Sequence, residues 1–202
     1  MSEAKLLPTR TVAKPWGCDR LPAPFVAPPG ERIGEIWFEP PPEVPQVLVK
    51  YLFTSEKLSV QVHPSDTQAP TGLRGKEECW IVLSAEPGAK LAVGFREQVS
   101  AEQMRSAALD GSIEGLLDWH AVAPGDFVYL PAGTVHALGA GLTLIEVQQN
   151  SDVTYRLYDY GRPRELHLEE AMEVAITAPY PDHHHRNRIG EGSTLVDSEH
   201  FR

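Results

Sequence analysis

The amino-acid sequence predicts a mainly β domain folded as a jelly-roll barrel, and three observations lead to this prediction. The chain has 202 residues, which is long enough to bury a sizeable core. Its 18 prolines and 16 glycines separate short runs of β-branched and aromatic residues. Eight such runs, with tight turns between them, suit a jelly roll. Because helical patterns occupy only two short stretches, we expect helices to be additions to the barrel.

Each predicted strand is an apolar or alternating run bounded by turn residues. The expected strands are 34–39, 46–54, 58–63, 78–84, 90–95, 126–131, 141–149 and 154–160.

Two helical stretches accompany these strands. The stretch at about 100–119 begins with Ser100 as N-cap and Gln103 three residues later, and Asp110-Gly111 separates it from a second short helix. We therefore expect a helical insert that lies outside the barrel. A C-terminal helix over about 166–176 is predicted from an apolar face at helical spacing.

Composition and charge exclude several classes of function. A formal net charge of −10 argues against a nucleic acid or an anionic membrane as partner, because both require clustered basic surface. The chain has no apolar run near the roughly 18 residues of a membrane helix, and its N-terminus lacks the apolar core of a signal peptide. Cys18 and Cys79 are far apart and show no metal-type spacing, which fits reduced thiols. These features predict a cytoplasmic protein.

Polar residues stand on strands where a core would take apolar ones. Gln61 and His63 are two residues apart, so an extended chain points both to one face. If the chain is extended from Lys76 onward, Lys76 and Glu78 share a face with Trp80.

Three further polar positions follow in the second half of the chain. His136 comes directly after a tight Pro-Ala-Gly-Thr corner, and Glu146 alternates with apolar neighbours on its strand. In the strand 154–160, alternation places Thr154, Arg156 and Tyr158 on one face.

Together, Gln61, His63, Glu78 and His136 form a set of two imidazoles, one carboxylate and one amide. Such a set suits a divalent metal with room for a water or a substrate oxygen. Each residue alone has a simpler interpretation, such as a hydrogen-bonded structural histidine or an exposed glutamine. Their order on a small barrel is typical of a metal-binding cupin.

Several longer motifs carry a resemblance to a known family. They are QVHP at 61–64, GKEECW at 75–80, GDFVYLPAGTVHA at 125–137 and EVQQNSDVTYRLYDYGR at 146–162, with KPWG and GEIW upstream. From about residue 12 to 176 the sequence closely resembles the type I phosphomannose isomerases, or mannose-6-phosphate isomerases, of the cupin superfamily.

The resemblance implies one zinc ion per chain, with Gln61, His63, Glu78 and His136 as its ligands. It also implies that the active-site arginine of the family corresponds to Arg156, and that Lys76 and Glu146 line the same pocket. The expected reaction interconverts mannose 6-phosphate and fructose 6-phosphate. Either Glu146 or a deprotonated Lys76 could be the general base, and Arg156, with Arg162 or Arg164, could hold the phosphate.

Two other functions remain open from the sequence. A cupin could bind a sugar phosphate without converting it, or two histidines and a carboxylate could hold iron(II) in an oxygenase. The fourth ligand from Gln61 would partly close the coordination face that an oxygenase needs.

The domain prediction places a catalytic cupin domain at 1–178 and a polar, loop-like tail at 179–202, in which a tract of three histidines is expected to be solvated surface. The tail resembles the opening of the C-terminal β-domain that family members usually have. The sequence leaves room for a homodimer and does not fix the preferred hexose phosphate.

Overall fold

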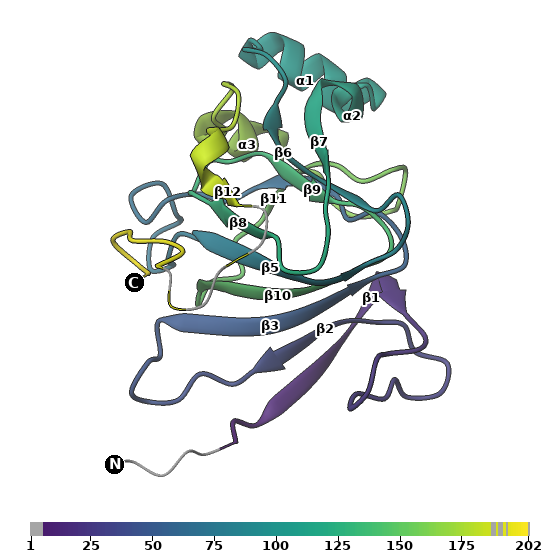
Figure 1. Cartoon of the computed structure of the whole chain (residues 1–202). Coiled ribbons are helices and arrows are strands. Elements are labelled where there is room, and N and C mark those ends of the chain that lie inside the picture. The colour runs from purple at the N-terminus through teal and green to yellow at the C-terminus, as the bar shows by residue number, and fades with distance from the viewer. Residues whose placement is uncertain (1–5, 187–188, 190–191, 193, 202) are drawn as a thin grey trace.

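The computed structural model describes residues 6–186, 189, 192 and 194–201, and it confirms the predicted mainly β architecture (Figure 1). The described strands are β1 (Thr9–Cys18), β2 (Ile33–Phe38), β3 (Val47–Thr54), β4 (Val60–Val62), β5 (Glu78–Ala85), β6 (Lys90–Phe95), β7 (Leu117–Ala121), β8 (Phe127–Leu130), β9 (His136–Leu138), β10 (Leu142–Gln149), β11 (Tyr155–Tyr158) and β12 (His185–Arg186). The described helices are α1 (Ala101–Asp110), α2 (Ile113–Leu116), α3 (Leu168–Val174) and the 3₁₀ turn Asp182–His184. None of these helices is long and apolar enough to cross a membrane.

The strands form two antiparallel sheets that enclose an apolar core. One sheet has the order β1-β2-β3-β10-β5-β8-β12 and the other β11-β4-β9-β6-β7. Leu52 and Leu144 of the first sheet belong to the same buried cluster as Leu91 and Leu138 of the second, so this cluster fills the space between the sheets. Inward-facing side chains of both sheets thus pack into one core, as the predicted barrel requires.

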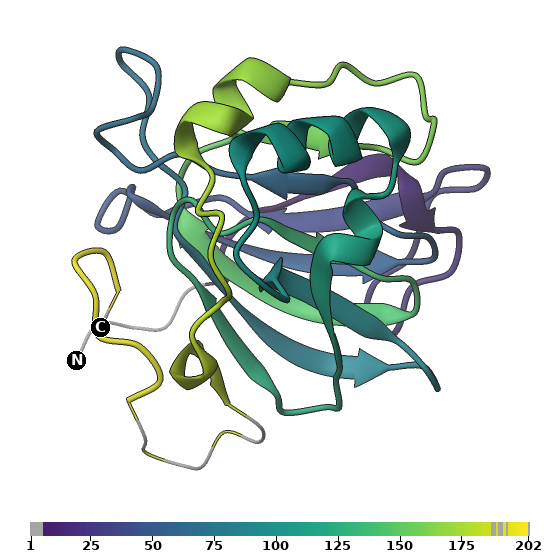
Figure 2. The ribbon, with the colours of Figure 1, turned by 90° about the horizontal axis from the view of Figure 1, so that it is seen from above.

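The helices cover the outer face of the five-stranded sheet, as Figures 1 and 2 show. Met104 and Ile113 of the helical insert and Ala171 of α3 are buried in a second cluster with Val60 and Ala92 of that sheet. Ser100 forms the expected capping box with Gln103, and Gly111 ends α1 in the left-handed conformation that favours glycine. The insert therefore lies outside the barrel, as expected.

Four strands were not predicted, and each has a local reason. Strand β1 carries Arg10, Lys14 and Pro15, and it pairs irregularly with β2 at the edge of its sheet, where proline is tolerated. Strand β7 was predicted as part of the insert up to residue 119, but its pairing with β6 makes it extended. Strands β9 and β12 have only three and two residues, too few for a periodic pattern.

The segment after α3 was expected to be loop-like and its histidine tract solvated. The tract instead begins in a 3₁₀ turn, and the ring of His184 packs edge-on against Tyr129 and Tyr180, with centroids 5.0 and 5.6 Å away. The expectation of a solvated tract is therefore wrong for His184. The side chains of His183 and His185 lie outside the description, as do residues 187–188, 190–191, 193 and 202 of the predicted tail.

Candidate active site

Three strand ends bring the expected metal ligands together at one end of the barrel. Gln61 lies in β4 and pairs directly with His136, the first residue of β9. His63 follows the last residue of β4, and Glu78 is the first residue of β5. Backbone pairing thus converts positions far apart in the sequence into neighbours.

The ligand atoms of His63, Glu78 and His136 converge within 4.8 Å of one another. Oε2 of Glu78 lies 3.6 Å from Nε2 of His63, and Oε1 of Glu78 lies 3.4 Å from Nε2 of His136. All three side chains are at most 2% exposed. One buried carboxylate and two imidazoles therefore face a common point.

Backbone carbonyl groups fix both imidazoles for metal binding. Nδ1 of His63 lies 2.8 Å from the carbonyl oxygen of Val153, and Nδ1 of His136 lies 2.8 Å from that of Thr134. Each Nδ1–H donates to its carbonyl, which leaves Nε2 of each ring as an acceptor. Nε2 of His63 faces the ammonium of Lys76 at 3.0 Å and Nε2 of His136 faces the amide of Gln61 at 3.2 Å, with the oxygens of Glu78 slightly farther away. Burial lowers the pKa of both rings, that of His136 to about 4. Both rings are therefore neutral ligands at pH 7.

The environment of Glu78 fits a cation at this point. Its two buried carboxylate oxygens accept no well-directed hydrogen bond from the described residues. The ammonium of Lys76, 2.8 Å from Oε2, is a charge partner on one side. Burial raises the pKa of Glu78 to about 7 even though Lys76 opposes this shift. An unsatisfied buried carboxylate facing two neutral imidazoles is a donor set that suits a divalent transition metal.

The amide of Gln61 lies beside this group. Its Nε2 is 3.2 Å from Nε2 of His136, and its Oε1 accepts a hydrogen bond from Ser59. A half-turn of the amide exchanges its nitrogen and oxygen, so the same position can present an oxygen ligand.

A cleft of about 420 Å³ opens above the group. Glu35, Lys50, Gln61, Lys76, Glu146, Asp152, Arg156 and Arg164 are among the residues that line it. The expected Gln61, Lys76, Glu146 and Arg156 are thus brought to one cavity.

Glu146 is held as a carboxylate at the base of this cleft. Its oxygens lie 3.2 Å from Nζ of Lys50 and 3.1 Å from Nε1 of Trp80, which donates a hydrogen bond. Burial alone would raise its pKa, but Lys76 and Lys50 outweigh burial and lower it to about 2. For Lys76, burial is outweighed by Glu78 and Glu146, and its pKa rises to about 12. At neutral pH the cleft therefore presents a carboxylate beside an ammonium.

Arg156 faces the cleft from β11, directly opposite Gln61 in the register. Its Nη1 donates to the carbonyl oxygen of Glu165, while its buried Nε has no hydrogen-bond partner among the described residues. Burial, with Arg164 nearby, lowers its pKa. A bulge after Arg156 moves Tyr158 into register with Val60 and into the cluster under the helices, so the predicted common face of Arg156 and Tyr158 is wrong.

The other two arginines divide between the cleft and the outside. Arg164 lines the cleft and makes a two-pronged contact with both oxygens of Asp159, at 2.6 and 2.7 Å. Arg162 contacts the same carboxylate, but it lines a different hollow with Glu56, Lys57 and Tyr160. The structure does not bring Arg162 to the cleft.

Sequence reasoning missed Lys50 as a cleft residue. Lys50 is 4% exposed, donates to Oε1 of Gln148, and lies 4.5 Å from the centroid of Trp37. Its flanking residues Leu48 and Leu52 gave a usable signal, because a lysine between two inward leucines on a strand must itself point inward.

Comparisons with known proteins bear on the family and the fold of this chain. No protein-family model matches the chain. The mannose-6-phosphate isomerase ManA of Bacillus subtilis is 39% identical over 168 residues, which is 77% of this chain and 53% of that protein. The mannose-6-phosphate isomerase of Streptococcus mutans is 43% identical over 136 residues, 63% of this chain and 43% of that protein.

A crystal structure of a mannose 6-phosphate isomerase from Bacillus subtilis superposes with a TM-score of 0.75 at 31% identity, covering 86% of this chain and 70% of that one. The chain belongs to the mannose-6-phosphate isomerase family. This likeness also confirms the predicted cupin barrel. The chain spans about half the length of the curated mannose-6-phosphate isomerases that it matches.

Proposed function

We propose that the chain is an aldose–ketose isomerase that interconverts mannose 6-phosphate and fructose 6-phosphate with one bound Zn²⁺. The observation that carries this proposal is the convergence of His63, Glu78 and His136 beside a charged cleft. The lining of this cleft includes Lys76, Glu146, Arg156 and Arg164. Membership of the mannose-6-phosphate isomerase family supports the choice of substrate.

His63, Glu78 and His136, with the amide oxygen of Gln61 after its half-turn, would hold the metal. When bound, zinc supplies Lewis acidity toward the oxygens of the sugar. Neutral imidazoles and the single carboxylate leave the site with a net positive charge, which favours an oxygen that gains negative charge. The carbonyl groups of Val153 and Thr134 keep the two rings in the required tautomer.

The isomerisation moves one proton between C1 and C2 of the open-chain sugar, so a base must accept it and return it to the neighbouring carbon. The charge states support Glu146 as this base, because its low pKa keeps it ionised. Lys76, which is protonated, would donate a hydrogen bond to the oxygen that gains charge.

Arg156 and Arg164 would bind the phosphate, since both line the cleft and a guanidinium matches phosphate oxygens in pairs. The partnerless Nε of Arg156 leaves that group ready for an anion. Asp159 fixes Arg164 through two contacts. Arg162, which also contacts Asp159, would then support the phosphate site from outside the cleft.

The test is a coupled assay of mannose 6-phosphate turnover, run with and without a chelator and after restoring Zn²⁺. We expect turnover that the chelator abolishes and zinc restores. Binding of mannose 6-phosphate without turnover would replace the isomerase by a sugar-phosphate-binding cupin. Iron in the aerobically purified protein, with no turnover on restoring zinc, would favour the oxygenase.

A further inference from the structure

A second hollow lies beside α2, at the β6–β7 edge of the five-stranded sheet. It has a volume of about 530 Å³ and is formed by α2, β7, the two ends of β6, and the turns at 86–89 and 139–140. It shares no lining residue with the cleft that lies beside the candidate metal ligands and is lined by Gln61. The hollow is therefore separate from the proposed isomerase site.

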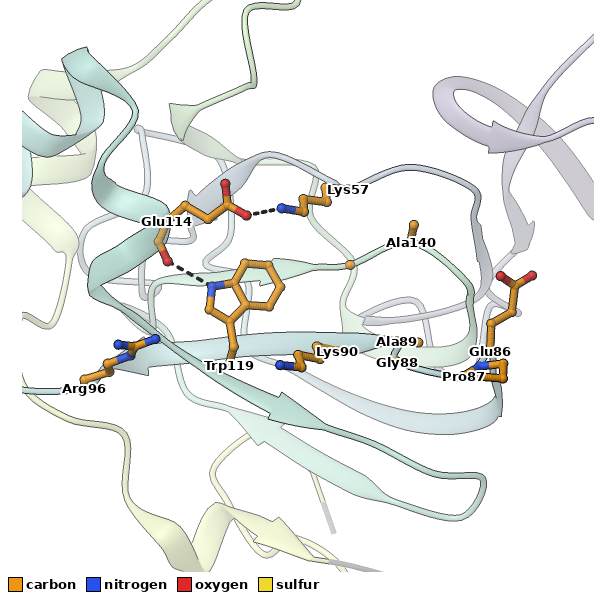
Figure 3. A pocket seen from close by; sticks show the side chains of 11 residues that line it. Lys57, Glu86, Pro87, Gly88, Ala89, Lys90, Arg96, Glu114, Trp119 and Ala140 are labelled. Carbon is orange, nitrogen blue, oxygen red and sulfur yellow. Dashed lines mark hydrogen bonds and ion pairs between the residues drawn. The ribbon is translucent and has the colours of Figure 1, made fainter.

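The indole of Trp119 is a fixed platform in this hollow (Figure 3). Its Nε1 donates a hydrogen bond of 3.0 Å to the carbonyl oxygen of Glu114, which fixes the orientation of the ring. Trp16 and Trp80 are, in contrast, buried in the barrel, and Trp37 lines the cleft. A partly exposed, oriented indole offers a flat apolar face to a ring-shaped ligand.

Cations surround this platform. Trp119 pairs in register with Ala92 of β6. Lys90 begins that strand and Arg96 directly follows its end, and Figure 3 shows the indole between their side chains. Lys90 and Arg96 are exposed, and neither forms an ion pair within the described part of the chain. Lys57 lies 5.7 Å from the ring centroid, and its charge is already balanced by Glu114. Two cations without an ion pair among the described residues thus flank one indole, although the carboxylate of Glu86 also lines the hollow at the end near Ala140.

We propose that this hollow binds a small organic phosphate, with its ring against Trp119 and its negative charge neutralised by Lys90 and Arg96. The ring contact requires a sugar or an aromatic base beside the phosphate, since inorganic phosphate would leave the indole unused. Lys57 forms a fixed wall of the hollow, because its carbonyl oxygen accepts a hydrogen bond from Arg162 while its ammonium pairs with Glu114. Flanking cations hold the phosphate by charge-assisted hydrogen bonds.

The experiment follows the indole N–H signals of the four tryptophans in the ¹⁵N-labelled full chain. The Trp119→Phe variant assigns the signal of Trp119. Adenosine 5′-monophosphate, glucose 6-phosphate and inorganic phosphate are titrated separately. We expect at least one of the two organic phosphates to shift the Trp119 signal saturably, at a concentration at least tenfold below that of inorganic phosphate. The organic phosphate that acts identifies the ring as aromatic or sugar.

The double variant Lys90→Gln/Arg96→Gln should raise the apparent Kd at least tenfold, while the matched surface change Arg20→Gln alters it less than twofold. A Trp119 signal that neither organic phosphate moves, or that moves equally in the double variant, overturns the proposal. Equal affinity for inorganic phosphate overturns the role of the indole. Binding in the cleft is measured independently, through the Trp37 signal and through turnover. Failure of the isomerase proposal would therefore be distinguishable from failure of this second site.

Discussion

The two ends of the barrel interior are built from the same strands but have opposite chemistry. At one end, Leu52 of β3, Leu144 of β10 and Val82 of β5 lie side by side in the register and are buried in the apolar cluster. Two residues farther along these strands, the row of paired side chains is Lys50, Glu146 and Trp80. Two residues along a strand, roughly 7 Å, separate a core from a reactive site.

This difference shows how one alternating pattern serves two purposes. Each polar group of the second row has a partner: Glu146 has Lys50 and Trp80, and Lys50 also has Gln148. Buried charges without partners would cost several kcal/mol each, so the row persists only as a network. Glu78, in the next row, is the member whose oxygens still lack well-directed hydrogen bonds, and it faces the imidazoles. The network therefore leaves one site for a metal.

The largest effect is expected from removing both imidazoles. The variant His63→Ala/His136→Ala should lose stoichiometric zinc, measured by metal analysis after dialysis, and all detectable turnover of mannose 6-phosphate. The physical reason is that Glu78 and Gln61 alone cannot complete a four-coordinate site. Circular dichroism serves as the control for folding. One equivalent of zinc retained by the folded double variant would refute the site.

The second prediction concerns the charged row. Glu146→Gln should lower kcat by about 10²- to 10⁴-fold, the contribution of a general base. Zinc content should stay at one equivalent, because Glu146 lies outside the group of His63, Glu78 and His136. A loss of less than threefold would transfer the role of base to another group.

The third prediction concerns the same carboxylate and the stability of the metal-free protein. The folded-state pKa of Glu146, about 2, lies below the ordinary 4.5. Its contribution to stability is therefore present above pH 4.5 and is lost as the pH falls from 4.5 toward 2, by about 3 kcal/mol. Urea unfolding between pH 5 and 2.5 should show wild type losing this difference relative to Glu146→Gln. Parallel pH profiles of the unfolding free energy in wild type and Glu146→Gln would contradict the lowered pKa of Glu146.

The fourth prediction separates the two arginines that sequence reasoning grouped together. Arg156→Lys should keep one zinc and a Tm within a few degrees of wild type but reduce kcat/KM by about 30- to 1,000-fold, because a paired guanidinium contact is worth roughly 2–4 kcal/mol. Arg162→Lys is the comparison variant and should change kcat/KM less than fivefold, since Arg162 lies outside the cleft and would act on the phosphate site only through Asp159. Equal losses of kcat/KM in both variants would show that Arg156 and Arg162 do not differ in their contact with the phosphate.

Much of the barrel and of the metal group could be predicted because both depend on local alternation. Gln61 lies on β4 with His63 directly after its end, and Glu78 begins β5, so their faces follow from the period of two of the extended chain. The edge strands β1 and β7 could not be predicted, because charged residues and Pro15 mask the pattern and pairing with a neighbour decides the conformation.

Prediction also fails where periodicity is interrupted. The bulge in β11 moves Tyr158 to the helix-facing side, and no residue type there announces it. Arg162 and Arg164 follow the end of that strand, where side-chain direction depends on a turn rather than on alternation. Their separate positions required the structure.

The smallest effect on activity is expected in the apolar row. Leu144 is fully buried next to Leu52 and Val82, so Leu144→Ala should lower the free energy of unfolding by about 2–5 kcal/mol through lost burial and a residual cavity. At 25 °C, zinc content should be unchanged and kcat/KM should stay within threefold of wild type, because no cleft residue loses a partner. Substitution of Glu146, two residues away on the same strand, should instead reduce activity strongly. If Leu144→Ala stayed folded yet lost activity to the same degree as Glu146→Gln, the two rows would act as one unit, and the boundary between core and site would have to be redrawn.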